Sequence, residues 1–402
     1  KGFINDFKEH VRSQRSALHT DLAFEKRWTF NSVMNFPEVL KTPNILHDVD
    51  KDIFIDKPAI IVSAGPSLNE ELENLRYIKE NGLAYIFAVG SANKTLIKNN
   101  IYPDAVCTYD PQGRNVKVYE EIISQGIDSI PMIFGSSVGF ETVEKYPGPK
   151  LHMITSQDTV AAYILQEAMQ NKLEIVNDAP SIAVVTFQML AKLHANPIIF
   201  VGQNLAYKGD YFYSKGIEYD TRKNTIDEKE KQNALIVKDV NGKEIRTNET
   251  FNSMRINLES YIAIYKDIEV INTTSGGAHI HGSKYIPLSE VIKDRLTEPI
   301  VNNEWYKIAT NQYNLAQVSA KLEELDHSFK DYQKLLKSLV SLLRDIDEKS
   351  KVVNPTELER YFQDYDHEFK AFSNNLFFKT FIRPIVRVAM DITNKKVQAV
   401  RF

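Results

Sequence analysis

The sequence has almost no cysteine and no long apolar run. One thiol, Cys107, stands among 402 residues, which excludes a disulfide framework within the chain and permits a reducing compartment. Cys107 lies in an apolar stretch, so we interpret it as a small core residue rather than as a nucleophile. No apolar run approaches the ~20 residues that a membrane-spanning helix needs, and no signal-peptide pattern is present. We therefore expect a cytoplasmic protein without a membrane span.

A large excess of charge of either sign is also lacking. The net charge is −4 at pH 7, and 25% of the residues are charged and 43% hydrophobic, as in an ordinary globular protein. This balance gives no reason to expect a nucleic-acid partner. The length leaves room for more than one domain, and homo-oligomer formation stays open. The chain begins at Lys1 rather than at a methionine, which leaves open whether residues precede it.

Short apolar runs alternate with helical patterns between residues 53 and 290. The runs that we expect to form strands are too short for helices and rich in β-branched residues, and they stand at 59–62, 84–90, 104–110, 131–135, 150–155, 197–202 and 268–272. Strands that alternate with helices imply right-handed crossovers between parallel strands. The sequence therefore predicts an α/β fold with a doubly wound, Rossmann-like parallel sheet.

Three regions depart from this alternation. Residues 1–52 are polar with scattered aromatics and predict an N-terminal segment of helices and loops. Residues 203–250 are rich in Tyr, Lys, Asp and Asn and contain an Asn-Gly hairpin turn, so we interpret them as an insertion or lid within the 53–290 domain. Residues 291–402 carry amphipathic periodicity, with a break at Pro355, and predict a C-terminal helical domain.

The stretch PAIIVSAGPSLNEEL, residues 58–72, predicts a strand, a tight turn and a helix. Ser67 and Glu70 have the spacing of a capping box, which would start the helix directly after the turn. Gly65 lets the backbone approach a ligand closely, and free N–H groups at the start of a helix favour an anion such as a phosphate. The stretch is not a Walker loop, because no G-K-[ST] follows, and it lacks the three glycines of the dinucleotide fingerprint.

Neutral polar residues follow most of the predicted strands. Ligands of open α/β sheets bind outside the carboxyl ends of the strands, so these residues are candidates for binding a nucleotide and a sugar. The candidate binding residues are Ser63, Gly65, Pro66, Ser67, Gly90, Ser91, Asn93, Thr155, Ser156, Gly202, Gln203, Asn204, Tyr207, Thr273, Thr274, Ser275, Gly276 and Gly277. Only two carboxylates, Asp110 and Asp158, stand at these ends, so we expect no metal site. Either can bind a ribose, act as a base or simply cap the next helix.

The candidate catalytic residues are Asp110, His279 and His281. Imidazole titrates near neutrality, so either histidine is a candidate general base. The H-x-H spacing is also a two-ligand start for zinc, but no third Cys, His or Glu stands close by in the sequence.

Four motifs, IIVSAGPSL, PDAVCTYDP, PIIFVGQNLAY and INTTSGGAHIHG, follow one another from Ile60 to Gly282. In this order they resemble the motility accessory factor (Maf) family of flagellin glycosyltransferases, whose central domain is similar to the bacterial sialyltransferases that share a G-P-S-L turn. The resemblance covers residues 25–290. The family pattern has G-Q-D-L-A and T-E-G-G-A, and here Asn204 and Ser275 replace the two acids. This weakens the assignment of an acidic base at either place.

The resemblance implies transfer of a nonulosonic acid, of the pseudaminic or legionaminic type, from a CMP-activated donor to Ser or Thr hydroxyls of flagellin. No cofactor is required besides the donor substrate. We expect the N–H groups of residues 65–68 to stabilise the CMP leaving group, and the hydroxyls and N–H groups of residues 273–277 to hold the carboxylate of the sugar. Asp110 and the loop 273–281 are then expected to line one pocket.

Two other functions stay open. Related proteins with the same G-P-S-L core resemble ATP-dependent pterin pyrophosphokinases, whose chemistry uses Mg²⁺ held by converging carboxylates. A flagellin-binding module without catalysis is the third interpretation. Aromatic residues of the C-terminal region form either an acceptor surface or ordinary packing, and they are Tyr361, Phe362, Phe369, Phe372, Phe377 and Phe378.

Overall fold

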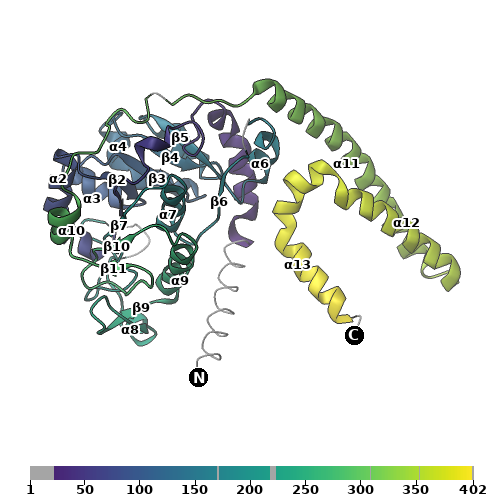
Figure 1. The fold of residues 1–402 in the computed structure, drawn as a ribbon. Helices are drawn as coiled ribbons and strands as arrows, with labels where there is room; N and C mark the ends of the chain where they lie inside the picture. Colours follow the sequence, from purple (N-terminus) through teal and green to yellow (C-terminus); the bar gives the residue numbers. More distant parts are fainter. Residues whose placement is uncertain (1–21, 170–171, 218–222, 308, 353, 401–402) are drawn as a thin grey trace. The chain divides into compact units, whose positions relative to one another are not determined.

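The computed structural model describes residues 22–400 apart from 170–171, 218–222, 308 and 353 (Figure 1). Contacts divide the described chain into two compact units. The first, an α/β unit, comprises Met34–Gln157 and Glu174–Gln312. The second, a helical unit, comprises 22–33, Asp158–Leu173 and 313–400. Within the described residues, no helix is long and apolar enough to cross a membrane.

One sheet of nine parallel strands organises the α/β unit. Its strand order is β11-β10-β7-β1-β2-β3-β4-β5-β6, and every neighbouring pair is parallel, which confirms the predicted fold class. The strands are β1 (Ala59–Val62), β2 (Tyr85–Val89), β3 (Ala105–Thr108), β4 (Met132–Gly135), β5 (Lys150–Thr155), β6 (Ile175–Val176), β7 (Ile198–Val201), β10 (Val270–Asn272) and β11 (Lys284–Tyr285). The sequence did not predict β6 and β11, which have two residues each.

Helices cover the sheet on both sides of the central strands. They are α2 (Leu72–Glu80), α3 (Ala92–Lys98), α4 (Glu120–Ser124), α5 (Phe140–Lys145), α7 (Ile182–Lys192), α9 (Glu249–Ile264) and α10 (Leu288–Arg295), with short 3₁₀ helices η1 (Lys51–Ile53), η2 (Pro66–Glu70) and η3 (Gly113–Tyr119). Helix α7 is buried from Ala183 to Ala191 and contacts β1, β2, β3, β6 and β7. Its sequence is predominantly apolar, as expected of a helix that the sheet and α9 enclose.

The predicted insertion contains a separate hairpin. Strands β8 (Leu235–Lys238) and β9 (Glu244–Thr247) pair in antiparallel register, after a short helix α8 (Glu228–Gln232). Gly242 has φ +81°, so the predicted Asn-Gly turn is confirmed. The N–H of Val240 bonds to the carbonyl of Gly277 at 3.1 Å, so the hairpin is tied to the loop after β10.

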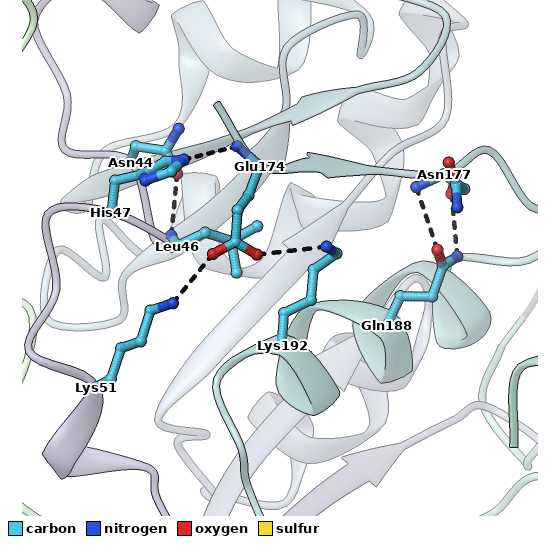
Figure 2. A network of polar contacts seen from close by, with 8 residues as sticks. All are labelled: Asn44, Leu46, His47, Lys51, Glu174, Asn177, Gln188 and Lys192. Atoms are coloured by element: carbon cyan, nitrogen blue, oxygen red, sulfur yellow. Dashed lines mark hydrogen bonds and ion pairs between the residues drawn. The ribbon is translucent and has the colours of Figure 1, made fainter. Parts of the chain in front are cut away.

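The segment 44–51, before β1, is joined to the α/β unit by a polar network (Figure 2). Figure 2 shows the Glu174 carboxylate between the ammonium groups of Lys51 and Lys192, at 3.1 and 3.3 Å. The N–H of Glu174 donates to Nε2 of His47 at 2.9 Å, and burial lowers the pKa of that imidazole. Beside this network, the Gln188 amide pairs with the backbone of Asn177. The network therefore joins the segment 44–51 to β6 and α7.

The α/β unit also extends past residue 290. The indole of Trp305 is 1% exposed and packs against Phe54 at a ring distance of 5.3 Å. The N–H of Ile300 bonds to the carbonyl of Gly82 at 2.8 Å, and that of Asn302 bonds to the Tyr85 hydroxyl at 3.0 Å. A boundary near residue 312 fits these contacts better than the predicted boundary at residue 290.

The helical unit contains α6 (Thr159–Leu165), α11 (Leu315–Lys349), α12 (Pro355–Asn374), a π-helical turn η4 (Phe378–Ile382) and α13 (Arg383–Val400). Figure 1 shows α11 and α12 side by side. Pro355 is the first residue of α12, and Asn354 caps it by accepting the N–H of Glu357 at 2.9 Å. The predicted break at Pro355 is thus confirmed as a helix start.

Candidate functional site

The strand order reverses between β1 and β7. From β1 the chain proceeds to β2 on one side, whereas β7 pairs with β1 on the other and β10 follows β7. Open α/β sheets bind ligands at such a switch point, outside the carboxyl ends of the strands. Three adjacent loops meet there: 63–71 after β1, 202–209 after β7 and 273–281 after β10. We call this place the crevice.

The N–H groups of the turn after β1 are already used. That of Gly65 donates to the carbonyl of Gly202 at 2.9 Å, that of Ser67 to Oδ1 of Asn204 at 3.1 Å, and that of Leu68 to the carbonyl of Gly65 at 3.0 Å. Pro66 has no N–H. The expectation that residues 65–68 offer free donors to a phosphate is therefore wrong, because the protein itself occupies them.

The predicted capping box is absent. The hydroxyl of Ser67 donates to Oδ1 of Asn204 at 2.8 Å, and the Glu70 carboxylate pairs with Lys208 at 2.5 Å. The turn continues as the 3₁₀ helix η2, and α2 begins only at Leu72. The S-x-x-E spacing therefore serves contacts with the loop after β7 rather than the start of a helix.

Two glycines let the loops after β1 and β7 touch. A Cβ on Gly65 would stand 2.3 Å from both Oδ1 of Asn204 and the carbonyl oxygen of Gly202. A Cβ on Gly202, which has φ +70°, would stand 2.2 Å from the carbonyl oxygen of Ser63. The close approach that we predicted at Gly65 exists, but its partner is protein backbone and the Asn204 amide.

The loop after β7 is held by the loop after β10. The N–H of Gln203 donates to Oγ1 of Thr274 at 3.0 Å, and the N–H of Ala278 donates to the Asn204 carbonyl at 2.8 Å. Ser63 Oγ donates to Oε1 of Gln203. Nδ2 of Asn204 is buried and has no hydrogen-bond partner within the described residues. A buried amide donor without a partner is costly, so this group is suited to an acceptor atom of a ligand.

The expected carboxylate cradle at 273–277 is mostly closed. Thr273 Oγ1 donates to the Phe200 carbonyl at 2.9 Å, and both Thr273 and Thr274 are buried. The N–H of Gly277 bonds to the Thr274 carbonyl at 3.2 Å. Only Ser275, which is exposed, keeps a hydroxyl on the surface of this loop, so the cradle as predicted from the sequence is wrong.

Lys208 bridges the three loops of the crevice. Its Nζ lies 2.5 Å from Oε1 of Glu70 and 3.5 Å from the Ser275 carbonyl oxygen. A Cβ on Gly276 would stand 3.7 Å from Cε of Lys208, so the lysine stem lies along that glycine. Glu71 is adjacent: burial raises the pKa of its carboxyl, Glu70 adds to this effect, and Lys208 opposes it.

The candidate binding residues after β2 and β7 point partly inward. Asn93 is fully buried, its Nδ2 donates to the Gly90 carbonyl at 2.6 Å, and its Oδ1 has no partner among the described residues. Ser91 is also buried. Tyr207 packs its ring against Phe212 at 5.0 Å in the small apolar cluster of the insertion.

A second polar cluster lies at the ends of β3, β5 and β6. The Tyr109 hydroxyl donates to Oδ1 of Asp178 and accepts from Nε2 of Gln157. The Asp178 N–H donates to Oγ of Ser156 at 2.8 Å, whereas Thr155 is buried and pairs with Ser137 at 2.9 Å. Sequence reasoning missed Asp178 because β6 is too short to recognise. The available signal was an acid directly before the sequence A-P-S, residues 179–181, which leads into α7.

The predicted catalytic residues do not come together. Three strands, β2, β1 and β7, lie between β3 and β10, so roughly 19 Å separates Asp110 from the loop after β10 at ~4.8 Å per strand. Asp110 accepts the N–H of Gln112 at 2.9 Å. Burial raises the pKa of the Asp110 carboxyl, against the opposing effects of Gln112 and Arg114. Asp110 and the loop 273–281 can line one pocket only for a ligand that spans this distance, so that expectation stays a prediction.

His279 and His281 are exposed on either side of the buried Ile280. The backbone N–H of His279 donates to the Lys238 carbonyl, and the backbone N–H of His281 donates to Oε1 of Glu259, both at 2.8 Å. In the part of the chain that the structure describes, no group of three or more His, Cys, Asp or Glu side chains could hold a metal ion.

Two other expectations concern buried or capping groups. Asp158 caps α6 by accepting the N–H of Ala161 at 2.8 Å, which is the structural alternative that the sequence left open. Cys107 is fully buried, and burial raises the pKa of its thiol to about 12, so the prediction of a core residue is confirmed.

Comparisons with known proteins bear on this arrangement. The family described as "6-hydroxymethylpterin diphosphokinase MptE-like" matches residues 30–210. No curated protein matches the chain at a significant level. Among solved structures, the Maf glycosyltransferase from Magnetospirillum magneticum AMB-1 is similar, with a TM-score of 0.58 and 14% sequence identity over 92% of this chain. The match covers 54% of that protein, so the chain spans about half of its length.

The matched structure confirms the resemblance to Maf proteins that the four motifs indicated, at the level of the fold. The family match ends at residue 210 and so includes the loops after β1 and β7, but not the loop after β10. Two of the three loops of the crevice therefore lie within the matched region.

Proposed function

We propose that this chain is a glycosyltransferase that moves a nonulosonic acid, of the pseudaminic or legionaminic type, from its CMP-activated form to Ser or Thr hydroxyls of flagellin. The observation that supports it best is the Maf-like fold with three polar loops that meet at its switch point. The reaction takes place in the cytoplasm, before flagellin is exported.

The transfer balances without a further reactant. The bond between the sugar carbon and the phosphate oxygen breaks, and its electron pair stays on the phosphate oxygen. The acceptor hydroxyl oxygen bonds to the sugar carbon and gives its proton to a base. Since no electrons enter or leave, the reaction needs no redox cofactor.

We consider two carboxylates outside the three loops of the crevice as candidates for that base, Asp110 after β3 and Asp178 after β6. Asp178 is exposed and already accepts a hydrogen bond from the Tyr109 hydroxyl. Burial raises the pKa of the Asp110 carboxyl, which makes its carboxylate a stronger base. His279 and His281 belong to the loop after β10, one of the three loops of the crevice, and stay candidates as well. The base takes the proton of the acceptor, so its loss should lower transfer and leave donor binding intact.

The deciding experiment is transfer by the purified chain. Flagellin is incubated with CMP-pseudaminic or CMP-legionaminic acid, with EDTA present, and its intact mass is measured. We expect one or more sugar masses to be added, about 10²–10⁴-fold more slowly after removal of the base, as is typical of general base catalysis. Asp178→Asn, Asp110→Asn and His281→Gln are compared with Asp128→Asn, an exposed aspartate that precedes β4 at the other edge of the sheet. No sugar mass from either donor would overturn the proposal.

A pyrophosphokinase is the second candidate, because the description of the matching family names that activity. It is tested by incubating the chain with ATP, Mg²⁺ and 6-hydroxymethylpterin and by measuring AMP release. AMP formation that depends on the pterin, together with no sugar transfer, would favour this function. A chain that retains flagellin in a pull-down but catalyses neither reaction would favour the third interpretation, a binding module.

The helical unit is proposed to hold the acceptor. Phe362 and Phe369 of α12 are 45% and 41% exposed, whereas Phe372 and Phe378 are buried with Leu339. The predicted group of aromatics thus divides into a core and an exposed part. A chain that ends at residue 312, which keeps Trp305 in place, should bind CMP and lose flagellin in a pull-down. Retention of flagellin by the shortened chain would place the acceptor site in the α/β unit.

A further inference from the structure

The charge of a bound phosphate needs a partner that the turn after β1 cannot supply. Its N–H groups at Gly65, Ser67 and Leu68 all donate to atoms of the protein. The three loops of the crevice, 63–71, 202–209 and 273–281, contain a single lysine and no arginine. That lysine is Lys208.

We propose that Lys208 is the cation that binds the phosphate of the ligand, and that Glu70 holds the ammonium group in the crevice until the ligand arrives. The proposal rests on the proposed function, since it concerns the nucleotide phosphate of the same crevice. Lys208 and Glu70 both lie outside the four sequence motifs.

The position of Lys208 is fixed at its backbone and adjustable at its tip. Its N–H and carbonyl pair with Tyr211, both at 3.3 Å, in an isolated antiparallel bridge. The stem lies along Gly276, where a Cβ would stand in van der Waals contact with Cε of Lys208 at 3.7 Å. Beyond the stem, Nζ reaches Glu70 from the loop after β1 and the Ser275 carbonyl from the loop after β10. The ammonium group therefore stands where all three loops meet.

The Glu70 pair is easily exchanged. The Glu70 side chain is 55% exposed and that of Lys208 is 30% exposed. An ion pair this open to water contributes little, because both partners are well solvated when apart. A phosphate offers Lys208 at least the same charge and more acceptor oxygens. Exchange of one anion for another thus leaves the ammonium group paired throughout.

The neighbouring acids make the proposal sharply testable. Glu70 competes directly with a bound phosphate for Lys208, and Glu71 stands beside both. Removal of the Glu70 charge should therefore strengthen phosphate binding, whereas removal of the Lys208 charge should weaken it. If the pair were only structural, both changes would act in the same direction.

The test compares CMP with cytidine, which lacks only the phosphate. Binding of each to the full chain is measured by calorimetry for the wild type and for Lys208→Gln, Lys208→Arg and Glu70→Gln. Lys238→Gln is the matched control, since Lys238 is 63% exposed and pairs with Glu244 outside the crevice. We expect Lys208→Gln to weaken CMP binding about tenfold, the value of one charge-assisted hydrogen bond, and to leave cytidine unchanged. Glu70→Gln should strengthen CMP binding, and Lys208→Arg should keep most of it.

The outcomes separate this proposal from the proposed function. UMP, AMP and GMP are tested beside their nucleosides. Suppose that CMP binds to the wild type. If Lys208→Gln then changes the affinity for CMP no more than Lys238→Gln does, or if Glu70→Gln weakens CMP binding, Lys208 is not the phosphate partner. The proposed function stands in that case. If another nucleotide binds in place of CMP and depends on Lys208, the phosphate partner is confirmed and the CMP donor is wrong. If no nucleotide binds to a wild-type chain shown to be folded by circular dichroism, the phosphate site is overturned.

Discussion

The two units of the chain bury their apolar side chains to very different extents. All four residues of β1 are buried, as are nine consecutive residues of α7. In α11, which has 35 residues, only Val318, Leu325 and Leu339 are buried. The α/β unit is thus built around a two-sided core, whereas the long helix of the helical unit buries a single narrow stripe.

Four of the apolar residues that α11 leaves exposed are regularly spaced. Leu322, Phe329, Leu336 and Leu343 follow one another at intervals of seven residues and are 36–49% exposed. A seven-residue interval returns to nearly the same side of a helix. The same residue types therefore stabilise the α/β unit strongly and this side of α11 weakly, a difference that composition alone does not show.

The largest effect is expected from an aromatic residue of the buried helix. Phe187 in α7 is fully buried, so Phe187→Ala should lower the free energy of unfolding by ~3–5 kcal/mol, from lost transfer energy and the cavity left behind. Phe362→Ala in α12, where the ring is 45% exposed, should cost less than ~1 kcal/mol. Urea denaturation followed by circular dichroism measures both. Equal losses would contradict the difference between the units.

A smaller loss is expected at the contact between the loops after β1 and β7. Gly202→Ala places a Cβ 2.2 Å from the Ser63 carbonyl oxygen at φ +70°, which should cost ~2–3 kcal/mol through strain and displacement of the turn. Gly209 has φ +62° but open space around it, so Gly209→Ala should cost only the ~1 kcal/mol of the left-handed conformation. A Gly202→Ala variant as stable as Gly209→Ala would show that the two loops are not tightly joined.

A pH-dependent effect is expected at a buried histidine of β5. Burial lowers the pKa of His152 to about 3, and the nearby His47 contributes to this shift. As the pH falls, the unfolded state therefore takes up a proton on this imidazole before the folded state does. The stability that neutral His152 contributes is complete above pH ~6.5 and is lost as the pH falls toward 3. Between pH 7 and pH 5 the wild type should lose ~2 kcal/mol of unfolding free energy from this group, at ~1.4 kcal/mol per pKa unit.

The pH prediction also has a control in the other unit. His152→Asn should flatten the stability profile between pH 7 and pH 5, while His327→Asn in the exposed part of α11 should leave the wild-type slope unchanged. Denaturant titrations at several pH values measure the slope. Equal slopes for wild type and His152→Asn would show that the buried imidazole does not govern acid sensitivity.

The smallest effect is expected within α11 itself. Leu336 is 39% exposed, so Leu336→Ala should change the free energy of unfolding by less than ~0.5 kcal/mol. Leu339, three residues later, is 5% exposed and packs with Phe372 and Phe378, so Leu339→Ala should cost ~2 kcal/mol. Thermal unfolding of the two variants compares them directly. A large loss for Leu336→Ala would mean that the exposed leucines are covered in solution.

Much of the fold could be predicted from short stretches of sequence. Seven apolar runs became the strands β1, β2, β3, β4, β5, β7 and β10, because a strand buried on both faces needs a continuous run of apolar residues. The hairpin turn at Gly242 and the helix start at Pro355 follow from the backbone preferences of these two residue types.

Elements that depend on neighbours could not be predicted in this way. The strands β6 and β11 have two residues each and exist through pairing with β5 and β10. Asp178 follows β6, so it was missed together with that strand. Trp305 gave no sign of its place in the core of the α/β unit, because the Phe54 ring that covers it lies far away in the sequence.

By itself, the sequence determined that a strand, a glycine turn and a polar loop recur along a parallel sheet, since these depend on local burial and backbone freedom. Only the tertiary structure decided which polar groups stay available. Ser67 bonds to Asn204, 137 residues further along, and Gly65 bonds to Gly202. These contacts use the N–H groups that the turn would otherwise offer and leave Lys208 beside Glu70. A hydrogen-bonding group is free or engaged according to what the fold brings to it, and no local pattern records that.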